Sequence, residues 1–73
     1  MKTKLVNDFL AYVIEEYKYW ENETAKNTIK LFTEHNVFDY IINHYDALHT
    51  LGGRAIADDI NLLTENGKIA NNV

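Results

Sequence analysis

Two histidines, three aspartates and one arginine lie between His44 and Ile60 of this chain, around a Gly-Gly pair. Histidine and aspartate are side chains that bind metal ions and transfer protons near neutral pH. The segment therefore suggests two candidate chemistries, a metal site and an acid–base pair. Both depend on which of these side chains the surrounding elements bring to one face.

A metal site within this segment would need His44, Asp46 and His49 on the same side of a helix. His44 and His49 are about 140° apart around a helix axis, because each residue turns the helix by about 100°. Asp46 and His49 are three residues apart and could meet, but two ligands are too few for a structural zinc site. His35 would have to come from another helix. We therefore expect no metal and no other cofactor.

An acid–base pair of His49 and Asp59 is geometrically possible if the helix after the glycines folds back on the helix before them. Such a pair also has a structural use, because a carboxylate fixes the tautomer of a neighbouring histidine and satisfies a buried donor. No nucleophile or oxyanion-binding group is evident nearby. We therefore expect the pair to lock two helices together, with Thr50 capping the turn, and we expect the protein not to be an enzyme.

The elements that would position these residues are helices. The chain has no proline, and period-two alternation of apolar and polar residues is nowhere sustained. The predicted fold is all-α, a compact single-domain bundle of about four helices over residues 1–67, followed by a disordered tail over residues 68–73. The helical spacing of apolar residues predicts helices over residues 3–20, 25–35, 38–49 and 54–65.

Each predicted helix has one apolar face. His49 falls in the middle of the third face, whereas His44 and Tyr40 project away from it. Asp59 borders the fourth face, and Asp58 points nearly opposite. The predicted core residues are Leu5, Val6, Phe9, Leu10, Val13, Tyr17 and Trp20 on the first helix, Ala25, Thr28, Ile29 and Phe32 on the second, Phe38, Ile41, Ile42, Tyr45 and Leu48 on the third, and Ile56, Ile60 and Leu63 on the fourth.

Small and polar residues mark the predicted helix ends. Thr24 is expected to cap the second helix, and Asn36 is expected to adopt the left-handed conformation just after it. Gly52 and Gly53 are expected to end the third helix with positive φ angles. The pair at residues 66–67, Asn-Gly, predicts the end of the last helix.

Composition limits the classes of partner. The absence of cysteine excludes disulfides and thiolate sites and suits a reducing cytoplasm. Seven basic residues are scattered along the chain against eleven acidic ones, which gives a net charge of −4 with histidine neutral. Nucleic-acid binders usually carry a basic stripe, and the scattered basic residues here form none. No apolar run approaches the ~20 residues that a membrane span needs. We expect a cytoplasmic protein with no membrane partner and no nucleic-acid partner, whose acidic surface favours a basic protein partner or simply solubility.

Tyrosines at the edges of the apolar faces predict a protein interface. Tyr12 and Tyr19 lie at the edge of the first helix's apolar face, and Tyr40 lies on the outer side of the third helix. Tyrosine at such positions is a favoured interface anchor. The expected partner is another protein or a second copy of this chain.

The segment over residues 37–60 contains Val-Phe-x-Tyr-Ile, then Tyr-x-x-Leu-His-Thr-x-Gly, and then Asp-Ile. In these three elements it resembles the recurrent core of a family of short bacterial proteins, domain-of-unknown-function family 3791. Its members carry a Val-Phe/Leu-x-Tyr-Ile segment after a turn, then Tyr-x-x-Leu-His-Thr-x-Gly, and then Asp-Ile. The similarity extends over about residues 5–65, and Asn36 stands where members often carry glycine. The matching residues here are Val37, Phe38, Tyr40, Ile41, Tyr45, Leu48, His49, Thr50, Gly52, Asp59 and Ile60.

The resemblance implies no established activity. Members are often encoded near proteins that resemble ADP-ribosyltransferases, which implies an antitoxin-like partner of a toxin. We therefore expect a non-catalytic protein-interaction domain, with His49, Thr50, Gly52 and Asp59 as a structural signature. Two alternatives stay open. One is a DNA-binding transcriptional autoregulator, although no basic recognition helix is evident, and the other is a small enzyme or ligand binder that uses His49 and Asp59.

Overall fold

The computed structural model describes the backbone of residues 2–72 and the side chains of residues 4–64. All regular structure in this part of the chain is helical, so the predicted all-α fold is confirmed. Residues 2–72 form five helices because the predicted helix over residues 38–49 is divided into two. The helices are α1 (Lys2–Glu21), α2 (Ala25–Glu34), α3 (Val37–Asn43), α4 (Tyr45–Leu48) and α5 (Gly53–Asn72).

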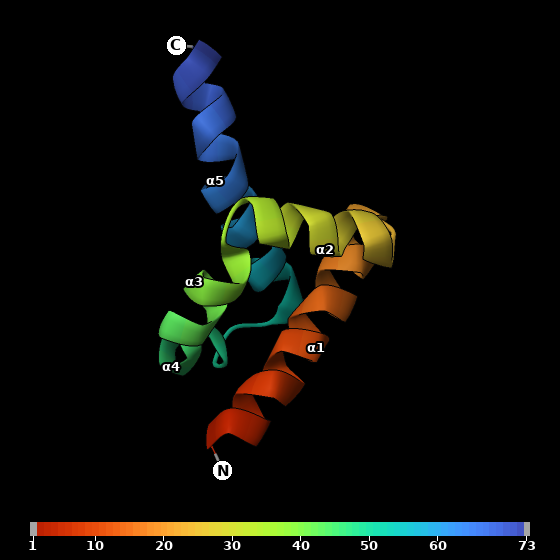
Figure 1. The fold of residues 1–73 in the computed structure, drawn as a ribbon, viewed down its shortest axis with the longest axis vertical. Helices are drawn as coiled ribbons and strands as arrows, with labels where there is room; N and C mark the ends of the chain where they lie inside the picture. Colours follow the sequence, from red (N-terminus) through yellow and green to blue (C-terminus); the bar gives the residue numbers. More distant parts are fainter. Residues whose placement is uncertain (1, 73) are drawn as a thin grey trace.

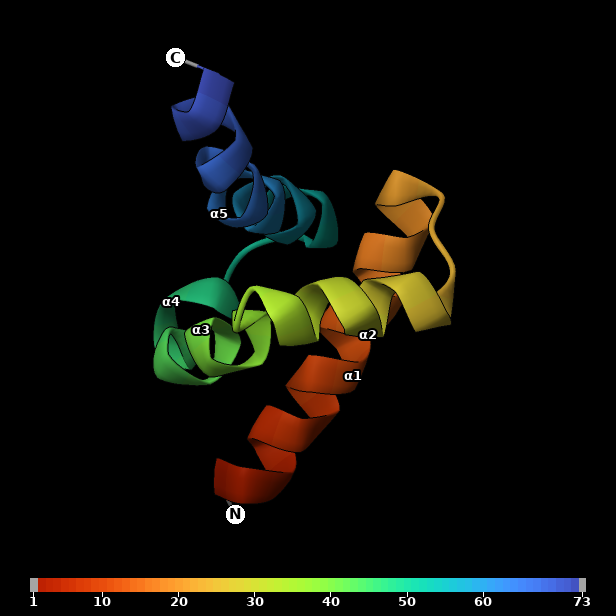
Figure 2. The same cartoon turned by 45° about the horizontal axis from the view of Figure 1, so that its top comes forward.

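Helix α1 is the element around which the others pack. Helix α2 crosses the C-terminal half of α1, and α3 and α4 follow at the far end of α2 (Figure 2). Helix α5 packs mainly on α1, and its last turns extend away from the other helices, so the two ends of the chain lie at opposite ends of the long axis (Figure 1). None of the described helices is both long and apolar enough to span a membrane.

The core contains at least one side chain from every helix. Five residues of the predicted core are exposed instead: Ala25, and four larger residues that are between 43% and 56% exposed, namely Leu5, Trp20, Ile29 and Ile42. Leu5 is exposed because the first turns of α1 extend beyond the other helices (Figure 1). The buried hydrophobic residues are Val13, Tyr17, Phe32, Val37, Ile41, Leu48, Ile56, Ala57 and Ile60.

The ends of α1 and α2 follow local signals. The Thr24 hydroxyl accepts a hydrogen bond from the backbone N–H of Asn27 at 3.1 Å, so the predicted cap of α2 is confirmed. Asn36 has the predicted left-handed conformation, with φ 55° and ψ 35°. Asn22 ends α1 in the same way, with φ 52°. Asparagine adopts this conformation more readily than other residues with a Cβ, which is why it ends both helices.

The C-terminal helix is longer than the sequence predicts. Helix α5 continues through residues 66–67 to Asn72, so the predicted stop at Asn-Gly is wrong. Glycine and asparagine lower helix propensity without forbidding the helical conformation. The side chains after Thr64 lie outside the described residues, and the predicted domain end at 67 and the tail over 68–73 stay predictions.

The predicted third helix is interrupted at His44. This residue has φ −115° and ψ 23°, and α4 begins immediately after it. On α4, the ring of Tyr45 meets Phe9 of α1 edge to face, with 5.3 Å between the centroids. On α3, the hydroxyl of Tyr40 reaches Asp59 of α5. These two contacts join the short helices to both α1 and α5.

Gly53 packs closely against the Glu16 side chain and does not have a special φ. Neither Gly52 nor Gly53 has a positive φ angle, so that prediction is wrong. A Cβ at residue 53 would lie 2.8 Å from Cγ of Glu16 and closer still to its carboxylate. Gly53 therefore allows α5 to begin in direct contact with α1.

Thr28 is fully buried on α2, and its hydroxyl has no hydrogen-bond partner among the described residues. A buried hydroxyl without a partner costs about 1–3 kcal/mol. We expect Thr28→Val to raise the free energy of unfolding by about 1 kcal/mol, because valine keeps the shape and removes the hydroxyl. Urea unfolding measures this change. Thr33→Val, at an exposed position of the same helix, is the control, and a Thr28→Val protein of lower stability would contradict the prediction.

Candidate functional site

The predicted pair of His49 and Asp59 does not form. His49 is exposed after the last residue of α4, and its Nδ1 lies 2.8 Å from the carbonyl oxygen of Tyr45. Its ring stacks parallel to that of Tyr45, with 4.7 Å between the centroids. Asp59 accepts a hydrogen bond from the hydroxyl of Tyr40 instead. The interruption at His44 removes His49 from the apolar face, so the lock between α3 and α5 uses Tyr40.

The other residues of the predicted signature shape the turn between α4 and α5. The Thr50 hydroxyl donates to the carbonyl oxygen of Ala47 at 2.8 Å, so its predicted capping role is confirmed. The Gly52 carbonyl accepts the first backbone hydrogen bond of α5, from Ile56 at 3.1 Å. These contacts are structural, and they leave His49 as an exposed side chain at the edge of the turn.

Tyr40 is not the exposed anchor that the sequence predicts. Its side chain is half-buried between α3 and α5, and its ring lies 4.6 Å from that of His44. The hydrogen bond to Asp59, together with burial and the negative charge of that carboxylate, raises the pKa of Tyr40 to about 12. The side chain therefore joins two helices and is removed from the candidate interface.

Tyr40→Phe is expected to lower the free energy of unfolding by about 1.5 kcal/mol at neutral pH, because it removes a hydrogen bond to a charged group. The pKa of Tyr40 is raised in the folded state from its ordinary value of 10.0 to about 12. The stabilisation is therefore complete below pH 10 and is lost as the pH rises to about 12. Urea unfolding over this pH range should show the two proteins converging. A difference that stays constant up to pH 12 would contradict the assignment.

The acidic and imidazole side chains do not gather into a metal site. Among the residues whose side chains are described, no group of three histidine, aspartate or glutamate side chains could hold a metal ion. His44 and Asp58 are both exposed, as predicted. The histidine and aspartate side chains of the segment from His44 to Ile60 therefore lie in separate surroundings and do not form one metal site.

An aromatic and cationic surface lies where the end of α1 meets the start of α5. Trp20 is 43% exposed and Tyr19 is 73% exposed, and their rings meet edge to face with 5.0 Å between the centroids. The guanidinium carbon of Arg54 lies 5.6 Å from the centroid of the Trp20 ring, within the range of a cation–π contact. We call Tyr19, Trp20 and Arg54 the Trp20 surface.

The Trp20 ring is held in place by contacts from both helices. Its Nε1 donates to Oε1 of Glu16 at 3.1 Å, one turn earlier on α1. The Glu16 side chain also faces Gly53, which places the next residue, Arg54, over the indole ring. The sequence prediction put Trp20 in the core because it falls on the apolar face of α1. The useful signal was Glu16 four residues before it, which gives the indole N–H a partner at the surface.

The composition of the Trp20 surface is typical of binding hot spots. Tryptophan, tyrosine and arginine are the residue types most enriched among side chains that dominate binding energy. Tyr12, 43% exposed, lies seven residues before Tyr19 and therefore on the same side of α1. Tyr12 and Tyr19 are exposed as the sequence predicts, and their role in an interface stays a prediction.

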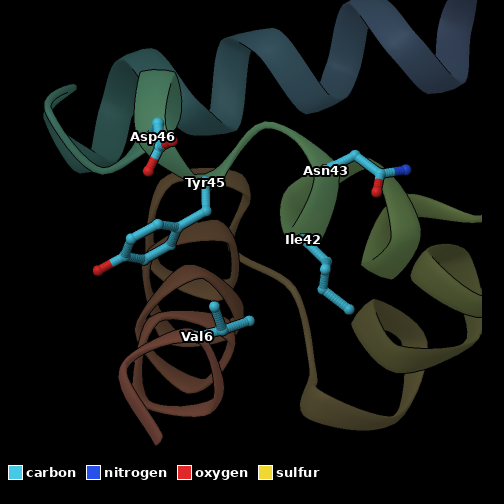
Figure 3. Close-up of a pocket in the computed structure, with 5 residues that line it drawn as sticks. All are labelled: Val6, Ile42, Asn43, Tyr45 and Asp46. Atoms are coloured by element: carbon cyan, nitrogen blue, oxygen red, sulfur yellow. The ribbon is translucent and has the colours of Figure 1, made fainter. Parts of the chain in front are cut away.

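A cleft lies on another part of α1, facing the junction of α3 and α4 (Figure 3). Its volume is about 320 Å³. The side chains of Ile42, Asn43 and Asp46 are exposed beside it. The lining residues are Val6, Ile42, Asn43, Tyr45 and Asp46.

Comparison with known proteins gives a family and no activity. The model of a family described as "Protein of unknown function (DUF3791)" matches residues 8–66. Neither the curated proteins nor the solved structures contain a significant match. The family match covers all of α2, α3 and α4 and most of α1. The chain therefore belongs to the DUF3791 family of proteins of unknown function.

Proposed function

We propose that this protein is a non-catalytic protein-interaction domain that binds its partner through the Trp20 surface. The observation that carries the proposal is the exposed Trp20 ring, held between Tyr19 and Arg54. While the indole is exposed, the protein does not gain the free energy that burial of its apolar area would provide. A partner that covers the ring recovers this free energy, and little side-chain entropy is lost because Glu16 already orients the ring.

The partner that we propose is a protein encoded beside this one in a bacterial genome and similar to ADP-ribosyltransferases, with this chain as its antitoxin-like partner in the cytoplasm. The resemblance of the segment over residues 37–60 to its family supports this choice of partner. The net charge of −4 favours association with a basic surface. A small helical domain can cover the surface of a toxin without chemistry of its own.

Support for a non-catalytic role comes from the two residues that an enzyme or ligand binder would use. Nδ1 of His49 is next to the carbonyl oxygen of Tyr45, and Asp59 accepts from Tyr40. Each group therefore has its own structural contact. The alternative that pairs His49 with Asp59 has lost its geometric basis.

Co-expression with the product of the adjacent gene tests the proposal. This chain should co-purify with that protein and elute with it as one complex in size-exclusion chromatography. Separate elution of the two folded proteins would overturn the choice of partner, whether this chain then runs as a monomer or as a dimer. Each protein expressed alone serves as the reference for the elution volume.

A further inference from the structure

We propose that the cleft between α1 and the α3–α4 junction binds a basic side chain, an arginine or a lysine, presented by a partner protein. The inference rests on the proposed function as an interaction domain and adds a second contact to it. Val6 at the cleft and Trp20 are separated by about 21 Å along α1, at about 1.5 Å per residue. A partner that spans both would therefore meet this domain at two distinct places.

The walls of the cleft suit the stem of a long basic side chain. Val6 comes from α1 and Ile42 from α3, and Ile42 is 45% exposed although it is a predicted core residue. Arginine and lysine bury their methylene groups against apolar surface of this kind while the charged end stays near water. Tyr45 adds an aromatic ring to the lining, and this ring is held by its edge-to-face contact with Phe9 and its stacking on His49.

The polar end of the cleft suits a cation. Asp46 is exposed, and no cation pairs with it among the described side chains. Lys4, two residues before Val6 on α1, is already 3.2 Å from Asp8. Asn43, whose side chain lies on the other side of Tyr45 from Asp46 (Figure 3), adds a polar amide group to the lining. An anionic ligand would face Asp46 without a compensating charge, and a purely apolar one would desolvate the carboxylate without a partner.

The size of the cleft limits the ligand to one side chain and its immediate neighbours. Its volume of about 320 Å³ is at the small end of ligand sites, which run to about 1,000 Å³. The interruption at His44 forms this site, because Ile42 and Asn43 precede it and Tyr45 and Asp46 follow it. The net charge of −4 adds a general attraction for a basic partner.

A peptide titration tests the inference on the full chain without the protein partner. The probe is acetyl-Ala-Leu-Arg-Leu-Ala-amide, and its control carries citrulline, which matches arginine in shape and has no charge. In two-dimensional amide NMR spectra, the arginine peptide should shift the signals of the cleft residues and leave those of the Trp20 surface unchanged. We expect the citrulline peptide to bind at least tenfold more weakly.

Variants of the chain make the assignment specific. Asp46→Asn should weaken binding of the arginine peptide at least fivefold, whereas Asp58→Asn, at an exposed aspartate on α5, should leave it unchanged. Ile42→Ala should also weaken binding, since it removes part of the apolar wall. Equal binding of the two peptides, or an Asp46→Asn protein that binds like the wild type, would overturn the inference. Peptide binding without co-purification of the proposed partner would support the cleft and overturn the choice of partner.

Discussion

Replacing Phe32 with alanine is expected to lower the free energy of unfolding by about 3–5 kcal/mol. Phe32 is fully buried, and its ring contacts Tyr17 of α1 and Phe38 of α3 edge to face, at 5.4 and 5.5 Å between centroids. A chain of this length has roughly 4–11 kcal/mol in total, so the substitution removes a large part of the stability. Circular dichroism during urea unfolding should show the midpoint moving sharply to lower urea.

The matched control is Ile29→Ala on the same helix. Ile29 is 47% exposed, so its truncation should cost less than about 1 kcal/mol. The comparison separates core packing from the general effect of removing an apolar side chain from α2. A Phe32→Ala protein as stable as the Ile29→Ala protein would show that α2 does not hold α1 and α3 together through this ring.

The positions of most helices could be predicted because their signals are local. Apolar residues at helical spacing locate the long helices, and Thr24 caps α2 with the predicted hydrogen bond. Asn36 adopts the left-handed conformation that its type and position favour. These features depend on neighbouring residues in the chain, and a single sequence contains them.

The interruption at His44 could not be predicted in the same way. Neither glycine nor proline marks it. The break occurs together with two contacts between distant segments, Tyr45 with Phe9 and Tyr40 with Asp59. On an unbroken helix His49 lies on the apolar face and Tyr40 lies outside it, which led to the wrong pairing. The sequence correctly predicts that Asp59 joins α3 and α5. The residue that contacts Asp59 is Tyr40 and not the predicted His49.

The Trp20 surface shows the limit of periodicity as a guide to burial. The pattern places every large apolar residue of one helix face in the core. Whether such a residue is actually buried depends on where the neighbouring helix begins. Gly53 starts α5 against Glu16, and the side chain that then reaches Trp20 is a charged arginine. Composition had pointed to tyrosines as interface anchors, and Tyr19 is part of the surface that the structure forms.

Trp20→Ala is expected to weaken binding of the co-purified partner by about thirtyfold or more, which corresponds to about 2 kcal/mol. The substitution removes the largest ring of the Trp20 surface and leaves Arg54 without the ring beneath it. The fold should persist, because the indole is half exposed and is absent from the buried core. Isothermal titration with the purified partner measures the loss, and the thermal midpoint confirms that the variant is folded.

The measurement that tests the central claim most directly is the partner affinity of Trp20→Ala compared with that of Leu62→Ala. Leu62 is a 60% exposed apolar residue on α5 outside the Trp20 surface, so it controls for the loss of apolar area. We predict that Trp20→Ala loses binding while Leu62→Ala binds within about threefold of the wild type, both proteins being folded. Equal affinities for the wild type and a folded Trp20→Ala protein would contradict the account.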